Sequence, residues 1–174
     1  MGITISMRRT LTVTALALIL GACASPASIQ PGATESETVA KLGKPAVERD
    51  LPNGGKRLVY TSQPMGQYAW VTDVDANGKV ISTTQALTSA RFKMIDDGLA
   101  EGRWTADRLL MEFGPPAEIT QVAMYPNEKV WGYRFREDGV WNSLMYVYVD
   151  SAGIVKRFHP GPDPMYEPRM MMGM

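Results

Sequence analysis

The stretch that decides the fold is TESETVAKLGKP at residues 34–45, which returns as TADRLLMEFGPP at residues 105–116. Each version begins with a threonine, continues with apolar residues at helical spacing, and ends in glycine followed by proline. Thr34 with Glu37 matches a capping box, which starts a helix. Gly43 accepts the left-handed conformation that ends a helix, and Pro45 prevents its continuation. The pattern therefore predicts one short helix in each copy.

The similarity between the two copies extends beyond these helices and indicates a duplication. Five positions recur without a gap 71 residues later, and further matches follow at an offset of 75. The four extra residues would fit in a hairpin loop of the second copy. The matched pairs are Thr34/Thr105, Val39/Leu110, Leu42/Phe113, Gly43/Gly114, Pro45/Pro116, Tyr60/Trp131, Asp75/Asp150, Gly78/Gly153 and Val80/Val155.

Four strands are expected after each helix, because β-forming residues alternate there with turn signals such as Asn53-Gly54-Gly55 and Asn77-Gly78. Residues 88–97 look helical and are expected to form the first helix of the second copy. The predicted fold class is α+β, with two tandem repeats that each pack a short helix pair on a small antiparallel sheet. The expected strands are 46–50, 56–61, 68–75, 79–84, 117–123, 129–136, 143–150 and 154–158.

The N-terminus has the features of an export signal. Arg8 and Arg9 precede an apolar stretch at 11–20, which is too short to span a bilayer. The stretch ends in Leu20-Gly21-Ala22-Cys23, which resembles the lipobox of bacterial lipoproteins. That resemblance implies cleavage between Ala22 and Cys23 and a covalent lipid on Cys23. The alternatives are an ordinary secretory signal with a chance cysteine and a translation start at Met7 instead of Met1.

Several acyl chains on one cysteine would anchor the protein stably without a transmembrane helix. Ala24 follows the cysteine, and a residue other than Asp at this place resembles the signal for sorting to the outer membrane of Gram-negative bacteria. The expected location is therefore the periplasmic face of the outer membrane. The expected segments are 1–22 for the signal peptide, 23–30 for a lipidated tether, 31–87 and 88–159 for the repeats, and 160–174 for a disordered Pro/Met-rich tail.

The composition excludes several functional classes. The chain has 18 basic and 18 acidic residues, so no electrostatic argument favours a nucleic-acid partner. It contains one cysteine and one histidine, His159, whereas metal sites and most nucleophile–base pairs draw on these residue types. We therefore expect no metal and no cofactor other than the lipid on Cys23. The composition leaves the oligomeric state open.

Gly32-Ala33-Thr34, Val39 and Leu42-Gly43-Lys44-Pro45 together resemble the SmpA/OmlA family of small outer-membrane lipoproteins, the BamE-like domain. The resemblance covers about residues 29–158 and implies a helix followed by a small antiparallel sheet. The second copy departs from the pattern at Gly102, Trp104 and Phe113. Two such halves also look like the tandem-repeat β-lactamase-inhibitor proteins, a similarity of fold that does not decide function. Because BamE proteins usually have one copy, the duplication leaves open whether the chain is an assembly-machine subunit or a relative with another partner.

Aromatic residues along the strands are the best candidates for a binding surface, because exposed Trp and Tyr mark hot spots. Tyr146 and Tyr148 share one strand face, and Val147 and Val149 share the other. If a helix covers one face of each sheet, some aromatics among Tyr68, Trp70, Tyr146 and Tyr148 must remain in contact with solvent, unless the two repeats pack sheet against sheet.

Other candidate residues have plainer explanations. Asp73 and Asp75 could form an acid/base pair, but a solvated edge before the turn is favoured because no third ligand type is evident. His159 is expected to begin the tail, and Met170–Met172 could bind soft metals or simply end the chain.

Three functions follow from these residues. The first is a non-enzymatic scaffold or accessory lipoprotein that binds outer-membrane proteins or their assembly machinery. The second is an inhibitor-like or ligand-binding periplasmic module that uses an aromatic sheet surface. The third is an enzyme, which the shortage of His and Cys disfavours.

Overall fold

A computed structural model describes residues 25–166, and the predicted signal peptide, Cys23 and Met170–Met172 lie outside this range. The first half contains the 3-10 turn η1 (Pro26–Ser28), helix α1 (Glu35–Leu42) and strands β1 (Val47–Asp50), β2 (Lys56–Thr61), β3 (Ala69–Val74) and β4 (Val80–Gln85). The second half contains α2 (Ser89–Phe92), the 3-10 turn η2 (Lys93–Ile95), α3 (Ala106–Phe113), β5 (Glu118–Gln121), β6 (Glu128–Glu137), β7 (Trp141–Asp150) and β8 (Val155–Pro162).

The predicted α+β class is confirmed. Within residues 25–166 the strands form two four-stranded antiparallel sheets, ordered β1-β2-β3-β4 and β5-β6-β7-β8. The expectation of a helix pair in each half is wrong for the first half, where α1 is joined only by the single turn η1. Pro26, Pro31 and Gly32 explain this, because proline and glycine interrupt a continuous helix there.

The predicted caps and helix ends are present, although Gly43 combines its positive φ with an extended ψ instead of the predicted left-handed conformation. Glu37 N donates to Thr34 Oγ1 at 3.0 Å, and Thr34 N donates to the Glu37 carboxylate at 2.7 Å, which completes the capping box. Thr105 caps α3 by accepting from Arg108 N at 3.1 Å. Gly43 and Gly114 end α1 and α3 with φ values of 82° and 79°. The two glycines therefore lie at equivalent helix ends, as the repeat predicts.

Strand pairing refines the alignment of the two copies. Asp75 Oδ1 accepts from Asn77 N and Lys79 N, and Asp150 Oδ1 accepts from Ala152 N and Ile154 N, so the offset of 75 is correct here. Bulges after Asp73 and after Tyr148 share this offset.

The match of Tyr60 to Trp131 is wrong. Tyr60 pairs with Trp70 and Tyr133 pairs with Met145, which makes Tyr133 the counterpart of Tyr60. The extra residues are thus split between the β5–β6 and β6–β7 hairpins instead of lying in one loop. An insertion of two residues preserves which strand face points inward, so the sheet could accept it.

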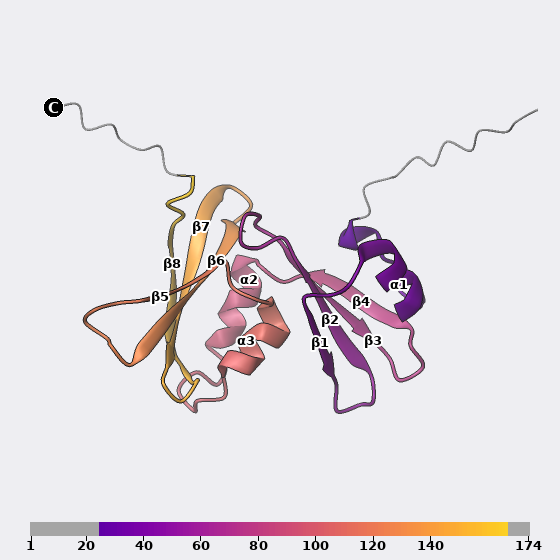
Figure 1. Cartoon of the computed structure of the whole chain (residues 1–174), viewed down its shortest axis with the longest axis horizontal. Helices are drawn as coiled ribbons and strands as arrows, with labels where there is room; N and C mark the ends of the chain where they lie inside the picture. Colours follow the sequence, from indigo (N-terminus) through magenta and orange to yellow (C-terminus); the bar gives the residue numbers. More distant parts are fainter. Residues whose placement is uncertain (1–24, 167–174) are drawn as a thin grey trace, which may run out of the picture.

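The elements stack in four layers, with α2 and α3 between the two sheets and α1 on the far side of the first sheet (Figure 1). The larger core includes Val59 and Val71 from the first sheet, Phe113 from α3, and Tyr133 and Val147 from the second sheet. A smaller core lies under α1 and contains Ile29, Leu58, Tyr60, Val74 and Val80. Within residues 25–166, the outer face of the second sheet has no helix over it (Figure 1).

The described parts of both expected end segments, 25–30 and 160–166, are more ordered than predicted. Ile29, assigned to the tether, is 7% exposed and belongs to the smaller core. β8 continues past His159 to Pro162, and Asp163 beyond it is buried and paired with Arg134. Proline is compatible with β8 because this strand lies at the sheet edge, where one side of the backbone needs no partner. Among the described residues, no helix combines the length and apolar character needed to cross a membrane.

Candidate binding surfaces

The four aromatic residues proposed from the sequence divide into two pairs. Tyr146 and Tyr148 lie on the outer face of the second sheet, because Val147 and Val149 on the other face belong to the core. Tyr68 and Trp70 belong to the first half and line a groove of about 440 Å³ beside α1. The alternation predicted for β7 is therefore confirmed, whereas the four aromatics do not line one common groove.

On the outer face of the second sheet, β8 places two basic side chains opposite the two tyrosines. His159 pairs with Tyr146 and Arg157 pairs with Tyr148. The Arg157 guanidinium lies 3.8 Å from the centre of the Tyr148 ring, and Tyr148 Oη lies 3.1 Å from His159 Nε2. Tyr125, from the β5–β6 connection, lies on the guanidinium too, with its ring centre 4.6 Å away. We call Tyr125, Tyr146, Tyr148, Arg157 and His159 the tyrosine face.

Interactions within the tyrosine face hold it in place before any partner binds. Glu128 of β6 forms a salt bridge of 2.7 Å with Arg157. The Arg157 guanidinium also lies over the Tyr125 and Tyr148 rings. A cation over aromatic faces is attracted by the ring quadrupole, so the arginine and the tyrosines stabilise one another. Gly161 allows the Tyr146 ring to lie close to the backbone, since a Cβ there would come within 3.0 Å of Tyr146 Cε2. Little side-chain entropy remains to be lost on binding.

Sequence reasoning missed three members of this face. Tyr125 and Arg157 were not singled out, and His159 was expected to begin the tail. The pattern Arg157-Phe158-His159 alternates as an edge strand should. The predicted strand 154–158 contains Arg157, but Pro160 and Pro162 argued against its extension to His159, which the structure shows.

The groove beside α1 contains a polar group without a partner. Tyr60 lines the groove, is 7% exposed, and its hydroxyl has no hydrogen-bond partner among residues 25–166. Burial raises the pKa of Tyr60, and the carboxylates of Glu35 and Glu48 raise it further. Its counterpart Tyr133 is satisfied, because its hydroxyl donates to the Gly114 carbonyl at 3.2 Å. The first half thus retains a buried hydroxyl without a described partner, on a residue that lines the groove.

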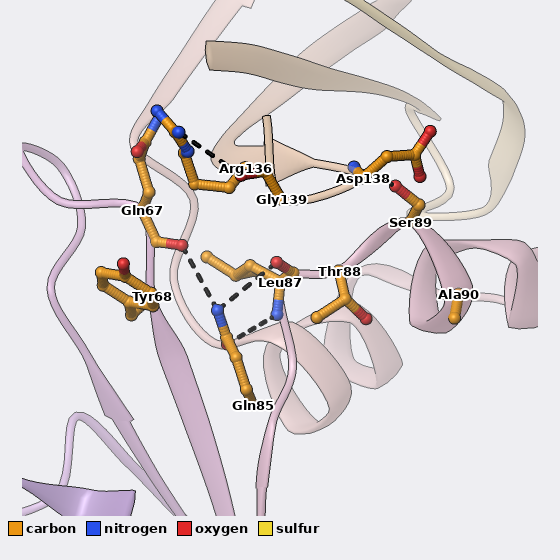
Figure 2. A pocket seen from close by; sticks show the side chains of 10 residues that line it. All are labelled: Gln67, Tyr68, Gln85, Leu87, Thr88, Ser89, Ala90, Arg136, Asp138 and Gly139. Carbon is orange, nitrogen blue, oxygen red and sulfur yellow. Dashed lines mark hydrogen bonds between the residues drawn. The ribbon is translucent and has the colours of Figure 1, made fainter. Parts of the chain in front are cut away.

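A second, more polar pocket of about 640 Å³ opens where the two halves meet (Figure 2). Gln85 spans its floor, where its Oε1 accepts from Leu87 N at 3.0 Å and from Ala69 N at 3.2 Å. On the opposite wall, Ser89 Oγ accepts from Asp138 N at 3.2 Å. Arg136 also holds a loop of the protein, since it donates to Asn142 Oδ1 at 2.9 Å and to the Gly139 carbonyl at 3.4 Å. The Tyr68 ring and the exposed Asp138 side chain remain for contact with a ligand.

Asp73 and Asp75 do not form a site. The Asp73 carboxylate accepts two hydrogen bonds from Arg57 at 2.7 and 2.9 Å, and this pairing is the largest cause of the raised pKa of Arg57. Asp75 is used by the turn that follows β3, and the bulge after Asp73 interrupts the alternation that would have aligned the two side chains. Among residues 25–166, no group of three or more His, Cys, Asp or Glu side chains could hold a metal ion.

Comparison with protein-family models, with curated proteins and with solved structures finds no match to this chain. The class is therefore defined by the structure itself. It is an α+β protein of two similar halves, with an uncovered aromatic face on its second sheet.

Proposed function

We propose that this chain is a non-enzymatic, lipid-anchored envelope protein that binds a protein partner in the outer membrane or periplasm through the tyrosine face. Outer-membrane proteins or their assembly machinery are the proposed partners, in keeping with the resemblance of residues 32–45 to the SmpA/OmlA family. The Leu20–Cys23 motif supports the anchor. The uncovered face of the second sheet is the observation that carries the proposal.

The internal repeat supports this choice of surface. In the first sheet, the corresponding face is covered by α3, where Arg57 binds Glu112 at 2.7 Å and Gly114 lies against Val59. Tyr146 and Tyr148 stand at the positions of Val71 and Asp73, given the offset of 75. The face of the first sheet that carries Val71 and Asp73 is thus covered by α3, whereas the corresponding face of the second sheet has no helix over it within residues 25–166 (Figure 1). A helical segment of a partner, with an apolar or aromatic stripe, suits this place.

A periplasmic ligand-binding module is the second candidate, and the polar pocket with Tyr68 and Arg136 favours it. The two functions use different residues. Loss of function on changing Tyr68 and Arg136, but not Tyr146 and Tyr148, would favour ligand binding over partner binding.

Variants of the tyrosine face test the leading proposal. Affinity capture from solubilised outer membrane should recover the partner with the wild type, and Tyr146→Ala and Tyr148→Ala should each weaken binding by about 2 kcal/mol, roughly thirtyfold. Both side chains are half-buried and packed on β8, so each change should lower stability by about 0.5–3 kcal/mol, and binding is compared at a temperature where every variant is folded. Ile81→Ala, an exposed position on the first sheet, is the control and should bind normally. Strong destabilisation with intact binding would place these tyrosines in the core.

The anchor has its own test. Cys23→Ser should block processing and leave a larger precursor, because the proposed lipid is attached through the thiol. Mass spectrometry of the wild type should find acyl chains on an N-terminal Cys23. An unmodified thiol on Cys23 would refute the lipid anchor. It would not affect the proposed role of the tyrosine face, which the binding experiment tests separately.

A further inference from the structure

Six exposed apolar side chains lie at one end of the molecule. Tyr68 and Met65 belong to the β2–β3 connection, Val140 to the β6–β7 turn, Trp141 to the first position of β7, and Met165 and Tyr166 to the segment after β8. Large exposed apolar groups that lie together usually mark an interaction surface. We call these six residues the apolar rim; their exposed fractions are 51% for Tyr68, 67% for Met65, 62% for Val140, 68% for Trp141, 40% for Met165 and 43% for Tyr166.

Hydrogen bonds join the three segments of the rim into one structure. Gln67 Nε2 donates to Asn142 Oδ1 at 3.0 Å, which ties the β2–β3 connection to β7. Asp163 N donates to the Asn142 carbonyl at 3.1 Å, which ties the last segment to the same residue. Arg134 donates to the Pro64 carbonyl at 2.8 Å and pairs with Asp163. The rim is therefore a supported surface and not three independent loops.

The described part of the chain begins at this same end. Ser25 lines the groove beside α1 together with Ser62 and Tyr68, and Figure 1 shows η1 on the same side of the molecule as the β2–β3 connection and the β6–β7 turn. Cys23 precedes Ser25 by two residues, which span at most about 7 Å. A lipid on Cys23 would thus hold this end, and not the opposite one, close to the bilayer.

Three hairpin tips at the opposite end of the sheets have a different composition, while the β5–β6 connection at that end also exposes Val122, Met124 and Tyr125. Residues 53–54, 76–78 and 151–153 consist of Asn, Gly, Ala and Ser, which suit contact with water. Trp and Tyr, by contrast, concentrate where proteins meet the membrane–water interface. The rim therefore places one exposed Trp and two exposed Tyr side chains at the end where the described chain begins, as expected of a membrane contact.

We propose that the apolar rim lies in the interfacial layer of the lipid bilayer beside the anchored Cys23. This inference rests on the proposed lipid anchor and adds a second contact to it. A lipid and a protein surface acting together bind a membrane more firmly than either alone. The rim also orients the protein. β6 and β7 extend from the rim toward the opposite end of the molecule. The tyrosine face on this sheet would therefore project from the membrane surface and remain accessible to a partner.

Trp141 provides the most exposed tryptophan probe at 68%, whereas Trp104 and Trp131 are 0% and 9% exposed; Trp70 is half-buried and gives a background that the Trp141→Phe variant retains. The lipidated full-length protein is mixed with phosphatidylethanolamine and phosphatidylglycerol vesicles, with or without brominated acyl chains, which quench nearby tryptophan. We expect brominated vesicles to reduce emission in the wild type. Trp141→Phe should lose most of this reduction, and vesicle binding should protect Trp141 from iodide in the aqueous phase.

A relocated tryptophan serves as the matched control. Trp141→Phe combined with Ile81→Trp places the probe near the opposite end of the first sheet, where it should stay accessible to iodide and escape the brominated chains. If wild-type protein floats with the vesicles but Trp141 remains unquenched, the rim is not a membrane contact and is left for a protein partner. If the protein fails to float and Cys23 has a bare thiol, both the anchor and this orientation are overturned.

Discussion

At the residue scale, the Glu37 carboxylate links the stability of α1 to pH. It accepts hydrogen bonds from Thr34 N at 2.7 Å and from Thr34 Oγ1 at 2.8 Å, and the backbone bond is the main reason that the pKa of Glu37 is lowered. Because the pKa in the folded state lies below the ordinary value of 4.5, the contribution is complete above that value. It is lost as the pH falls through the folded-state value. Glu37→Gln should therefore be less stable than the wild type near neutral pH, and the two should converge in acid.

Urea denaturation of both proteins across this pH range measures the effect. Thr105→Ala is a suitable control, because the cap of α3 uses Thr105 Oγ1 without a carboxylate partner. Its loss of about 1 kcal/mol should change little with pH. A difference between Glu37→Gln and the wild type that stays constant in acid would show that the carboxylate charge is irrelevant to the cap.

At the element scale, the glycines that end α1 and α3 differ in what surrounds them. Both have φ near 80° and an extended ψ, a region almost restricted to glycine, so alanine at either position costs about 1–3 kcal/mol. A Cβ at Gly43 would meet nothing within 4 Å, whereas one at Gly114 would come within 3.0 Å of Val59 Cγ1. Gly114→Ala should therefore lower the free energy of unfolding by about 1–3 kcal/mol more than Gly43→Ala.

Chemical denaturation of the two variants gives this difference directly. The double variant Gly114→Ala with Val59→Ala supplies the check, since a smaller side chain at Val59 removes the contact with the new Cβ. The two substitutions should then be less costly together than the sum of their separate effects. Equal losses for Gly43→Ala and Gly114→Ala would mean that α3 does not pack on the first sheet as described.

At the scale of the whole molecule, one core joins the two halves. Phe113 is fully buried, stacks on Phe92 at 4.7 Å and on Trp104 at 5.9 Å, and lies between residues of both sheets. Phe113→Ala should reduce stability by about 3–5 kcal/mol and should destabilise both halves. Unfolding followed by tryptophan fluorescence and by far-UV circular dichroism should give coincident curves in the wild type and in the variant. Two separate transitions would show that the halves are independent domains.

Much of the fold could be predicted because its signals are local. The cap at Thr34, the helix end at Gly43 and the turn at Asn77-Gly78 each depend on residues a few positions apart, so the sequence itself contains their cause. The outward placement of Tyr146 and Tyr148 follows in the same way from strand alternation, once Val147 and Val149 are assigned to the core.

Other features depend on contacts between residues that are far apart in the sequence, and only the tertiary structure reveals them. Arg57 brings Asp73 and Glu112 together, and the pairing of β8 with β7 makes His159 and Arg157 part of a surface. The apolar rim arises from three segments that hydrogen bonds bring together. Sequence alone determined helices α1 and α3, the turns and the strand faces, because propensity and periodicity act over short distances. The neighbours of each face were decided by packing, because burial and pairing depend on the whole folded chain.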